Sequence, residues 1–201
     1  MEDLMSVLIG DNNENGIEDQ LLKDRKIVLN GDVADWCVND VCMQIMKWNQ
    51  EDKDIIPEKR KKIYILINSG GGDAISGMNM LDVIVNSDTP VVTIGFGMAA
   101  SMAGYILAAG HERYCFLNTV VLIHDGESGY QSSGRKGKDI QAFYDKISER
   151  LEDFLVEHTD MTHEYLQEIA DREVYLFGEE SKEKGIVDKI IGIDCNLNEV
   201  F

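Results

Sequence analysis

Residues 63–73 have the sequence Ile-Tyr-Ile-Leu-Ile-Asn-Ser-Gly-Gly-Gly-Asp, an apolar run that ends in a glycine turn. Five consecutive apolar residues predict a strand that is buried on both faces, as in a parallel sheet. Beyond the turn, apolar residues recur at helical spacing across residues 75–85. A strand, a glycine turn and a helix in this order indicate an α/β fold.

Further strands and helices are predicted on both sides of this unit. The predicted strands cover residues 26–29, 91–94, 114–117 and 120–123, and the predicted helices cover residues 35–49, 98–109, 139–158, 165–169 and 179–184. Their alternation favours a single domain with a mainly parallel sheet. Residues 1–20 are polar and predict an arm or loop ahead of this domain.

Residues 91–110 contain no charged side chain and are long enough to span a bilayer. The first half of this stretch is rich in β-branched residues and the second half is rich in alanine, with Gly95 and Gly97 between them. This division predicts a strand at 91–94, a turn at 95–97 and a buried helix rather than one membrane helix.

The net charge argues against two classes of partner. The 201 residues include 37 acidic and 19 basic side chains, which gives a net charge of -18. Nucleic acids and anionic membranes both attract basic surfaces, so we expect this chain to bind neither. The charge lies at the flanks: residues 1–60 carry -7 and residues 138–201 carry -10, whereas the region between them carries only -1.

The four cysteines are Cys37, Cys42, Cys115 and Cys195, which form no C-x-x-C pair and lie at no metal-ligand spacing from the histidines. We therefore expect reduced thiols, no metal and no other cofactor, as in a cytoplasmic protein. The first four residues, Met-Glu-Asp-Leu, lack the basic region of a secretory signal.

Two turns should meet at the carboxyl edge of the sheet, where residues of parallel strands come together. One is the glycine turn at 70–72, and the other is the segment 97–102, in which Ser101 lies near the start of a helix of small residues. His124 follows the strand at 120–123 and should reach the same edge. A hydroxyl, an imidazole and exposed backbone N–H groups are the parts of a serine hydrolase. Each part alone also fits an ordinary helix start, strand end or phosphate-binding turn.

Several segments, in this order, resemble the proteolytic subunit of the Clp protease. They are residues 21–31, 67–72, 97–102 and 109–110, Arg113, Asn118, residues 123–124 and 171–173, Glu180 and residues 185–188. The resemblance covers about residues 20–192. It implies repeated ββα units wound into a superhelix, a fold shared with crotonase-type enzymes, with a protruding handle helix. It also implies one peptidase domain at 21–201, a handle at 126–158, and a flexible axial arm at 1–20.

The resemblance implies roles for four residues of the predicted site. Ser101 would be the nucleophile, and His124 would take its proton and give it to the leaving amine. The backbone N–H groups of Gly72 and Met102 would form the oxyanion hole.

The third member of the triad is where this sequence departs from the family. The family has an aspartate after an arginine, and here that position is Glu173, which follows Arg172. A glutamate can orient a histidine in some hydrolases, although its extra methylene needs a shifted backbone. Asp171 is the alternative.

The resemblance also implies assembly into two stacked heptameric rings around a closed chamber that degrades unfolded polypeptides. Arg172 matches an arginine that bridges the rings. The expected partner is an AAA+ unfoldase, whose docking positions would be Tyr64, Leu66, Ile94, Phe96, Tyr114, Phe116 and Ile191. Ordinary core packing would explain the same apolar residues.

The function that the sequence predicts is therefore that of a serine endopeptidase, the proteolytic subunit of a self-compartmentalised ATP-dependent protease. A crotonase-type acyl-CoA enzyme is one alternative, because such enzymes also hold an oxyanion with two backbone N–H groups. A non-catalytic ring subunit, in a mixed ring with an active paralogue, is another, and it is suggested by the departure at Glu173.

Overall fold

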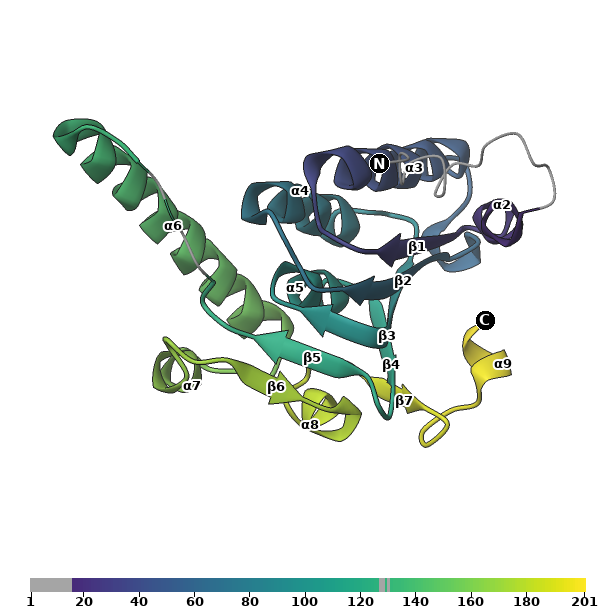
Figure 1. The fold of residues 1–201 in the computed structure, drawn as a ribbon. Coiled ribbons are helices and arrows are strands. Elements are labelled where there is room, and N and C mark those ends of the chain that lie inside the picture. The colour runs from purple at the N-terminus through teal and green to yellow at the C-terminus, as the bar shows by residue number, and fades with distance from the viewer. Residues whose placement is uncertain (1–15, 127–128, 130) are drawn as a thin grey trace.

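The computed structural model describes residues 16–126, 129 and 131–201. Its strands are β1 (Lys26–Asn30), β2 (Ile63–Ser69), β3 (Val91–Ala100), β4 (Glu112–Phe116), β5 (Val120–Ile123), β6 (Val174–Leu176) and β7 (Lys189–Ile191). In this part of the chain they form one sheet of order β1-β2-β3-β4-β7, with β5 beside β3 and β6 beside β5 (Figure 1). Only the β5–β6 pairing is antiparallel. The predicted α/β fold with a mainly parallel sheet is confirmed.

The helices are α2 (Ile17–Lys23), α3 (Asp35–Glu51), α4 (Ala74–Val85), α5 (Met102–Ala108), α6 (Gly134–His158), α7 (His163–Glu168), α8 (Gly178–Glu183) and α9 (Leu197–Val200), with a 3₁₀ turn η1 (Pro57–Lys59). The apolar faces of α3, α4 and α5 bury the main hydrophobic core against the sheet.

β2 buries every second residue, and Tyr64 and Leu66 between them stay partly exposed. The prediction that both faces of this strand are buried was therefore wrong for the second face.

The segment that carries Ser101 differs from its prediction. β3 continues to Ala100, whereas the sequence predicted a turn at 95–97 and a helix from residue 98. The extension forms because Met98, Ala99 and Ala100 pair with β5, an interaction that small-residue propensity does not reveal. α5 begins only at Met102, so Ser101 lies between a strand and a helix.

Two other predicted boundaries also shift. α2 begins at Ile17, inside the predicted arm, and residues 1–15 lie outside the described residues. α6 begins at Gly134 rather than at residue 139 and extends away from the sheet in Figure 1. In the described ranges, no helix combines the length and apolar character needed to cross a membrane.

A buried ion pair fixes the end of α3 to the start of β1. The Arg25 guanidinium donates from both terminal nitrogens to the Asp52 carboxylate, with Nη2 at 2.9 Å from Oδ1. The side chains are only 12% and 6% exposed. The hydrogen bond from Arg25 holds the pKa of Asp52 below its usual value. Removing the Asp52 charge would leave the largely buried Arg25 with weaker partners, the carbonyl of Lys61 and the Glu51 carboxylate at 3.9 Å.

We therefore expect Asp52→Asn to lower the free energy of unfolding by about 3 kcal/mol. Asp54→Asn is the control, because Asp54 is exposed in the same turn and should change stability by less than about 0.5 kcal/mol. A carboxyl whose pKa is lowered by folding stabilises the protein above its unfolded pKa of about 3.9, and this contribution is lost as the pH falls further. Urea unfolding at pH 7 and pH 3 should therefore show a smaller difference between wild type and Asp52→Asn in acid. Equal stability of the two Asn variants at pH 7 would contradict this role.

Candidate active site

The carboxyl ends of β2, β3 and β5 meet at one edge of the sheet, beside α6. A pocket of about 420 Å³ opens there and contains both Ser101 and His124. Tyr105 from α5 and Leu151 from α6 contribute apolar wall. Burial, followed by the nearby charge of Asp125, raises the pKa of Tyr105 to about 12, so this hydroxyl stays neutral near pH 7. The pocket therefore combines polar groups with a partly apolar wall.

Ser101 adopts a strained backbone conformation at the turn between β3 and α5. Its φ is 53° and its ψ is -128°, a region that side-chain-bearing residues rarely occupy. The Ser101 N–H donates to the carbonyl of Leu122 at 2.9 Å, which ties the turn to β5. A nucleophile elbow uses the same kind of sharp strand-to-helix turn to expose its serine.

The glycine turn after β2 lies directly against this serine. A Cβ on Gly71 would lie 2.7 Å from the Cβ of Ser101, and Gly71 also has a φ of 94°. Both the close approach and the backbone conformation therefore require glycine at this position. The sequence predicted the exposed turn but not its contact with the serine.

Ser101 and His124 form the central contact of the pocket. His124 Nε2 lies 2.7 Å from Ser101 Oγ, within hydrogen-bonding distance, and both side chains are partly buried. When Nδ1 carries the ring proton, Nε2 can accept the proton of the serine hydroxyl. The predicted meeting of these two residues at one sheet edge is present in the structure, and their catalytic roles stay predictions.

Two backbone N–H groups flank the serine. The Val33 N–H donates to the carbonyl of Gly71, and the Asp73 N–H donates to the carbonyl of Val33, both at 2.8 Å. These two hydrogen bonds form a β-bridge between Val33 and Gly72 that does not use the N–H of Gly72. Met102 is the first residue of α5, where helical N–H groups lack an intrahelical partner. Across the described ranges, neither N–H group donates to a protein acceptor. Both therefore remain able to bind an oxyanion. Sequence reasoning gave no signal for the supporting role of Val33.

The two candidate acids for the third triad position have different neighbours. Glu173 immediately precedes β6, and its Oε2 accepts a hydrogen bond of 2.7 Å from the Tyr175 hydroxyl. Asp171 has a φ of 59°, and its N–H donates to the carboxylate of Asp125. Within the described part of the chain, neither acid is hydrogen-bonded to His124. Glu173 and Asp171 both stay predictions for this role, and Tyr175 is a neighbour that the sequence analysis missed.

The predicted docking positions divide into two groups. Five of them gather in a small apolar cluster that also contains Val200 of α9: Tyr64, Ile94, Tyr114, Phe116 and Ile191. The ring of Phe201 stacks on Tyr64 with a centroid separation of 6.2 Å. Leu66 and Phe96 are partly buried outside this cluster. The segment after β7 therefore covers part of the predicted docking surface.

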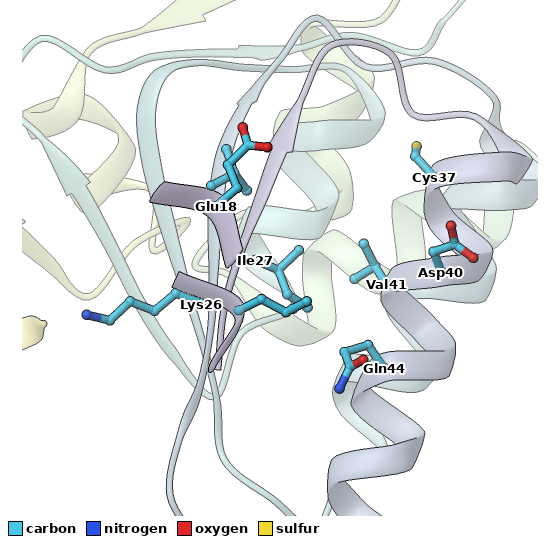
Figure 2. A pocket seen from close by; sticks show the side chains of 9 residues that line it. Glu18, Lys26, Ile27, Cys37, Asp40, Val41 and Gln44 are labelled. Atoms are coloured by element: carbon cyan, nitrogen blue, oxygen red, sulfur yellow. The ribbon is translucent and has the colours of Figure 1, made fainter. Parts of the chain in front are cut away.

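Arg172 and a cavity beside α2 both lie outside the pocket that Ser101 lines. The Arg172 side chain is exposed and forms no ion pair with the residues that the structure describes. A cavity of about 80 Å³ lies between α2, β1 and α3, where Ile27 and Val41 form its apolar part (Figure 2). The lining of this cavity contains no serine and no histidine. The pocket around Ser101 is therefore the candidate active site.

A comparison against protein families places all of these site segments inside one family match. The sequence model of the family described as Clp protease matches residues 10–194. The match includes the glycine turn, the strained serine, His124 and both candidate acids, and it covers most of the chain. This chain belongs to the Clp protease family.

Proposed function

We propose that this chain is a serine endopeptidase, the proteolytic subunit of a Clp-type ATP-dependent protease. Membership of the Clp protease family implies a peptidase. The observation that carries the serine mechanism is the 2.7 Å contact between Ser101 Oγ and His124 Nε2. Ser101 occupies a strained turn at the mouth of a pocket, where an ordinary helix-start serine would have no reason to be strained.

In the acylation step, Ser101 Oγ attacks the carbonyl carbon of a peptide bond while His124 Nε2 takes the hydroxyl proton. The negative charge that develops on the carbonyl oxygen is stabilised by the N–H groups of Gly72 and Met102. Removing one such donor typically costs ~10²–10³ in rate. His124 then gives its proton to the leaving amine, and the C–N bond breaks.

In the deacylation step, water attacks the ester on Ser101 and His124 removes a proton from that water. The same two N–H groups stabilise the second tetrahedral intermediate. The acid product leaves when Ser101 regains its proton from His124. Glu173 is the residue that we assign to orient the histidine through Nδ1, and Asp171 is the alternative.

The assembly that we propose has two stacked heptameric rings, and an AAA+ unfoldase supplies unfolded polypeptides. The length of α6 and its extension away from the sheet support a role as the handle between rings, with Arg172 at that contact (Figure 1). The apolar cluster around Tyr64 and Tyr114 supports an unfoldase docking surface. The domain proposed for this subunit is 21–201, with the arm at 1–20 as the axial loop.

Labelling with a fluorophosphonate tests the proposed nucleophile directly. We expect one adduct per chain, on Ser101, because an activated serine reacts far faster than an ordinary hydroxyl. Ser148→Ala is the matched control: Ser148 lines the same pocket, but among the described residues its hydroxyl bonds to the carbonyl of Tyr144 and to no imidazole. Ser101→Ala should lose the adduct, and Ser148→Ala should keep it, as measured by mass spectrometry of the intact chain.

Two outcomes of this labelling would favour the alternatives. An unlabelled Ser101 together with hydrolysis of an acyl-CoA thioester would favour the crotonase-type enzyme. An unlabelled Ser101 together with assembly into rings with an active paralogue would favour a non-catalytic subunit.

A further inference from the structure

The pairing of β5 with β6 ends one residue short of His124 and Glu173. Ile123 pairs with Val174 and Leu122 pairs with Tyr175 in this antiparallel ladder. Continuing the register by one residue brings His124 opposite Glu173. Directly opposite residues share a face of the sheet, with Cβ atoms about 5 Å apart. From this position, the Glu173 side chain is long enough for its carboxylate to reach the imidazole of His124.

The carboxylate of Glu173 is held from its other side by Tyr175. These two residues are two positions apart, so they point to the same face of the extended chain. The Tyr175 hydroxyl donates to Glu173 Oε2 at 2.7 Å, and Tyr175 is 56% exposed. The hydrogen bond to Glu173 raises the pKa of Tyr175, so the hydroxyl keeps its proton near pH 7. Its one hydrogen bond within the described ranges is to this carboxylate.

We propose that Tyr175 is a positioning residue that fixes Glu173 Oε2 and leaves Oε1 free to accept the Nδ1–H of His124. A glutamate has one more rotatable bond than the aspartate that the family uses, so its carboxylate needs an additional restraint. A hydrogen bond donated by the Tyr175 hydroxyl to one carboxylate oxygen restrains this additional rotatable bond. The second carboxylate oxygen keeps its lone pairs available as an acceptor. This inference rests on the proposed function and on Glu173 as the triad acid.

The test is a double-mutant cycle of Tyr175→Phe and Glu173→Gln, with peptide turnover measured on the assembled protein. Tyr175→Phe removes only the hydroxyl, and we expect kcat to fall about fivefold with KM unchanged. In the Glu173→Gln background the same change should have less than about a twofold effect, because the group on which Tyr175 acts is gone. A merely structural role of Tyr175 would lower kcat equally in both backgrounds.

Tyr165→Phe is the matched control, since the Tyr165 hydroxyl has no hydrogen-bond partner among the residues described, and kcat should not change. Equal kcat of Tyr175→Phe and wild type would overturn the proposal, as would an equal loss in both backgrounds. An increase in kcat would also overturn it, because the hydroxyl would then hold the carboxylate away from His124. Each of these results leaves the peptidase in place if fluorophosphonate labels Ser101. Absence of labelling would overturn both.

Discussion

Ser101→Ala is expected to reduce the turnover of small fluorogenic peptides to less than about 1% of the wild-type rate. The reason is that Ser101 Oγ lies 2.7 Å from an imidazole nitrogen, whereas Ser148, the other serine in the described pocket lining, bonds to a backbone carbonyl. The change removes one oxygen and leaves the backbone bond from residue 101 to Leu122 intact. Folding and assembly should therefore be preserved.

The measurement compares kcat of Ser101→Ala and Ser148→Ala at equal ring concentration, with assembly followed by light scattering. Ser148→Ala should stay within about twofold of wild type, because this exposed serine performs no step of the mechanism. Residual activity of Ser101→Ala above about 1%, in a preparation free of wild-type chains, would contradict the assigned nucleophile.

The parts of the fold that the sequence predicts well are those whose pattern is local. The run Ile63–Ser69 forms β2, and α4 begins at Ala74, one residue before the helical spacing that the sequence shows across residues 75–85. Asp73 caps that helix by accepting the N–H of Ser76 at 2.7 Å, the role that its position favours. These features depend on the periodicity and capping chemistry of adjacent residues, so no tertiary information is needed.

The parts that the sequence does not predict depend on pairing between distant segments. β6 and β7 are only three residues long, and each is a strand because a neighbour pairs with it. The C-terminal half of β3 has alanine and glycine where a strand usually has β-branched residues, and β5 makes it extended.

The candidate site also combines features that the sequence predicts with features that depend on distant segments. Parallel topology alone places Ser101 and His124 at one edge of the sheet, because both residues follow strands that end there. The strained φ of Ser101 and its contact with Gly71 come from the packing of two turns, which a single sequence does not encode locally. The hydrogen bond from Tyr175 to Glu173 depends on the extended conformation around β6, a strand that the hydrophobic pattern does not reveal.

Glu173→Gln should impair peptide turnover far more than Asp171→Asn. We expect a loss of about 10³–10⁴ in kcat for Glu173→Gln, the effect of replacing a triad carboxylate by its amide. The amide keeps the shape of the side chain but offers its NH₂ group where Nδ1–H needs an acceptor, so the imidazole is stabilised in the wrong tautomer. The expected loss for Asp171→Asn is less than about threefold, because the residue binds Asp125 through its backbone N–H, which the substitution keeps.

The register of β6 explains why these two acids differ. Glu173 and His124 each lie one position beyond the Ile123–Val174 pair, whereas Asp171 lies three positions before β6 and has a φ of 59°. Steady-state kinetics on the two variants, with fluorophosphonate labelling of Ser101 as a second readout, separate the cases. A larger loss for Asp171→Asn would transfer the third role to Asp171. Small losses for both would mean that Ser101 and His124 act as a dyad, because an orienting carboxylate cannot be neutralised without cost.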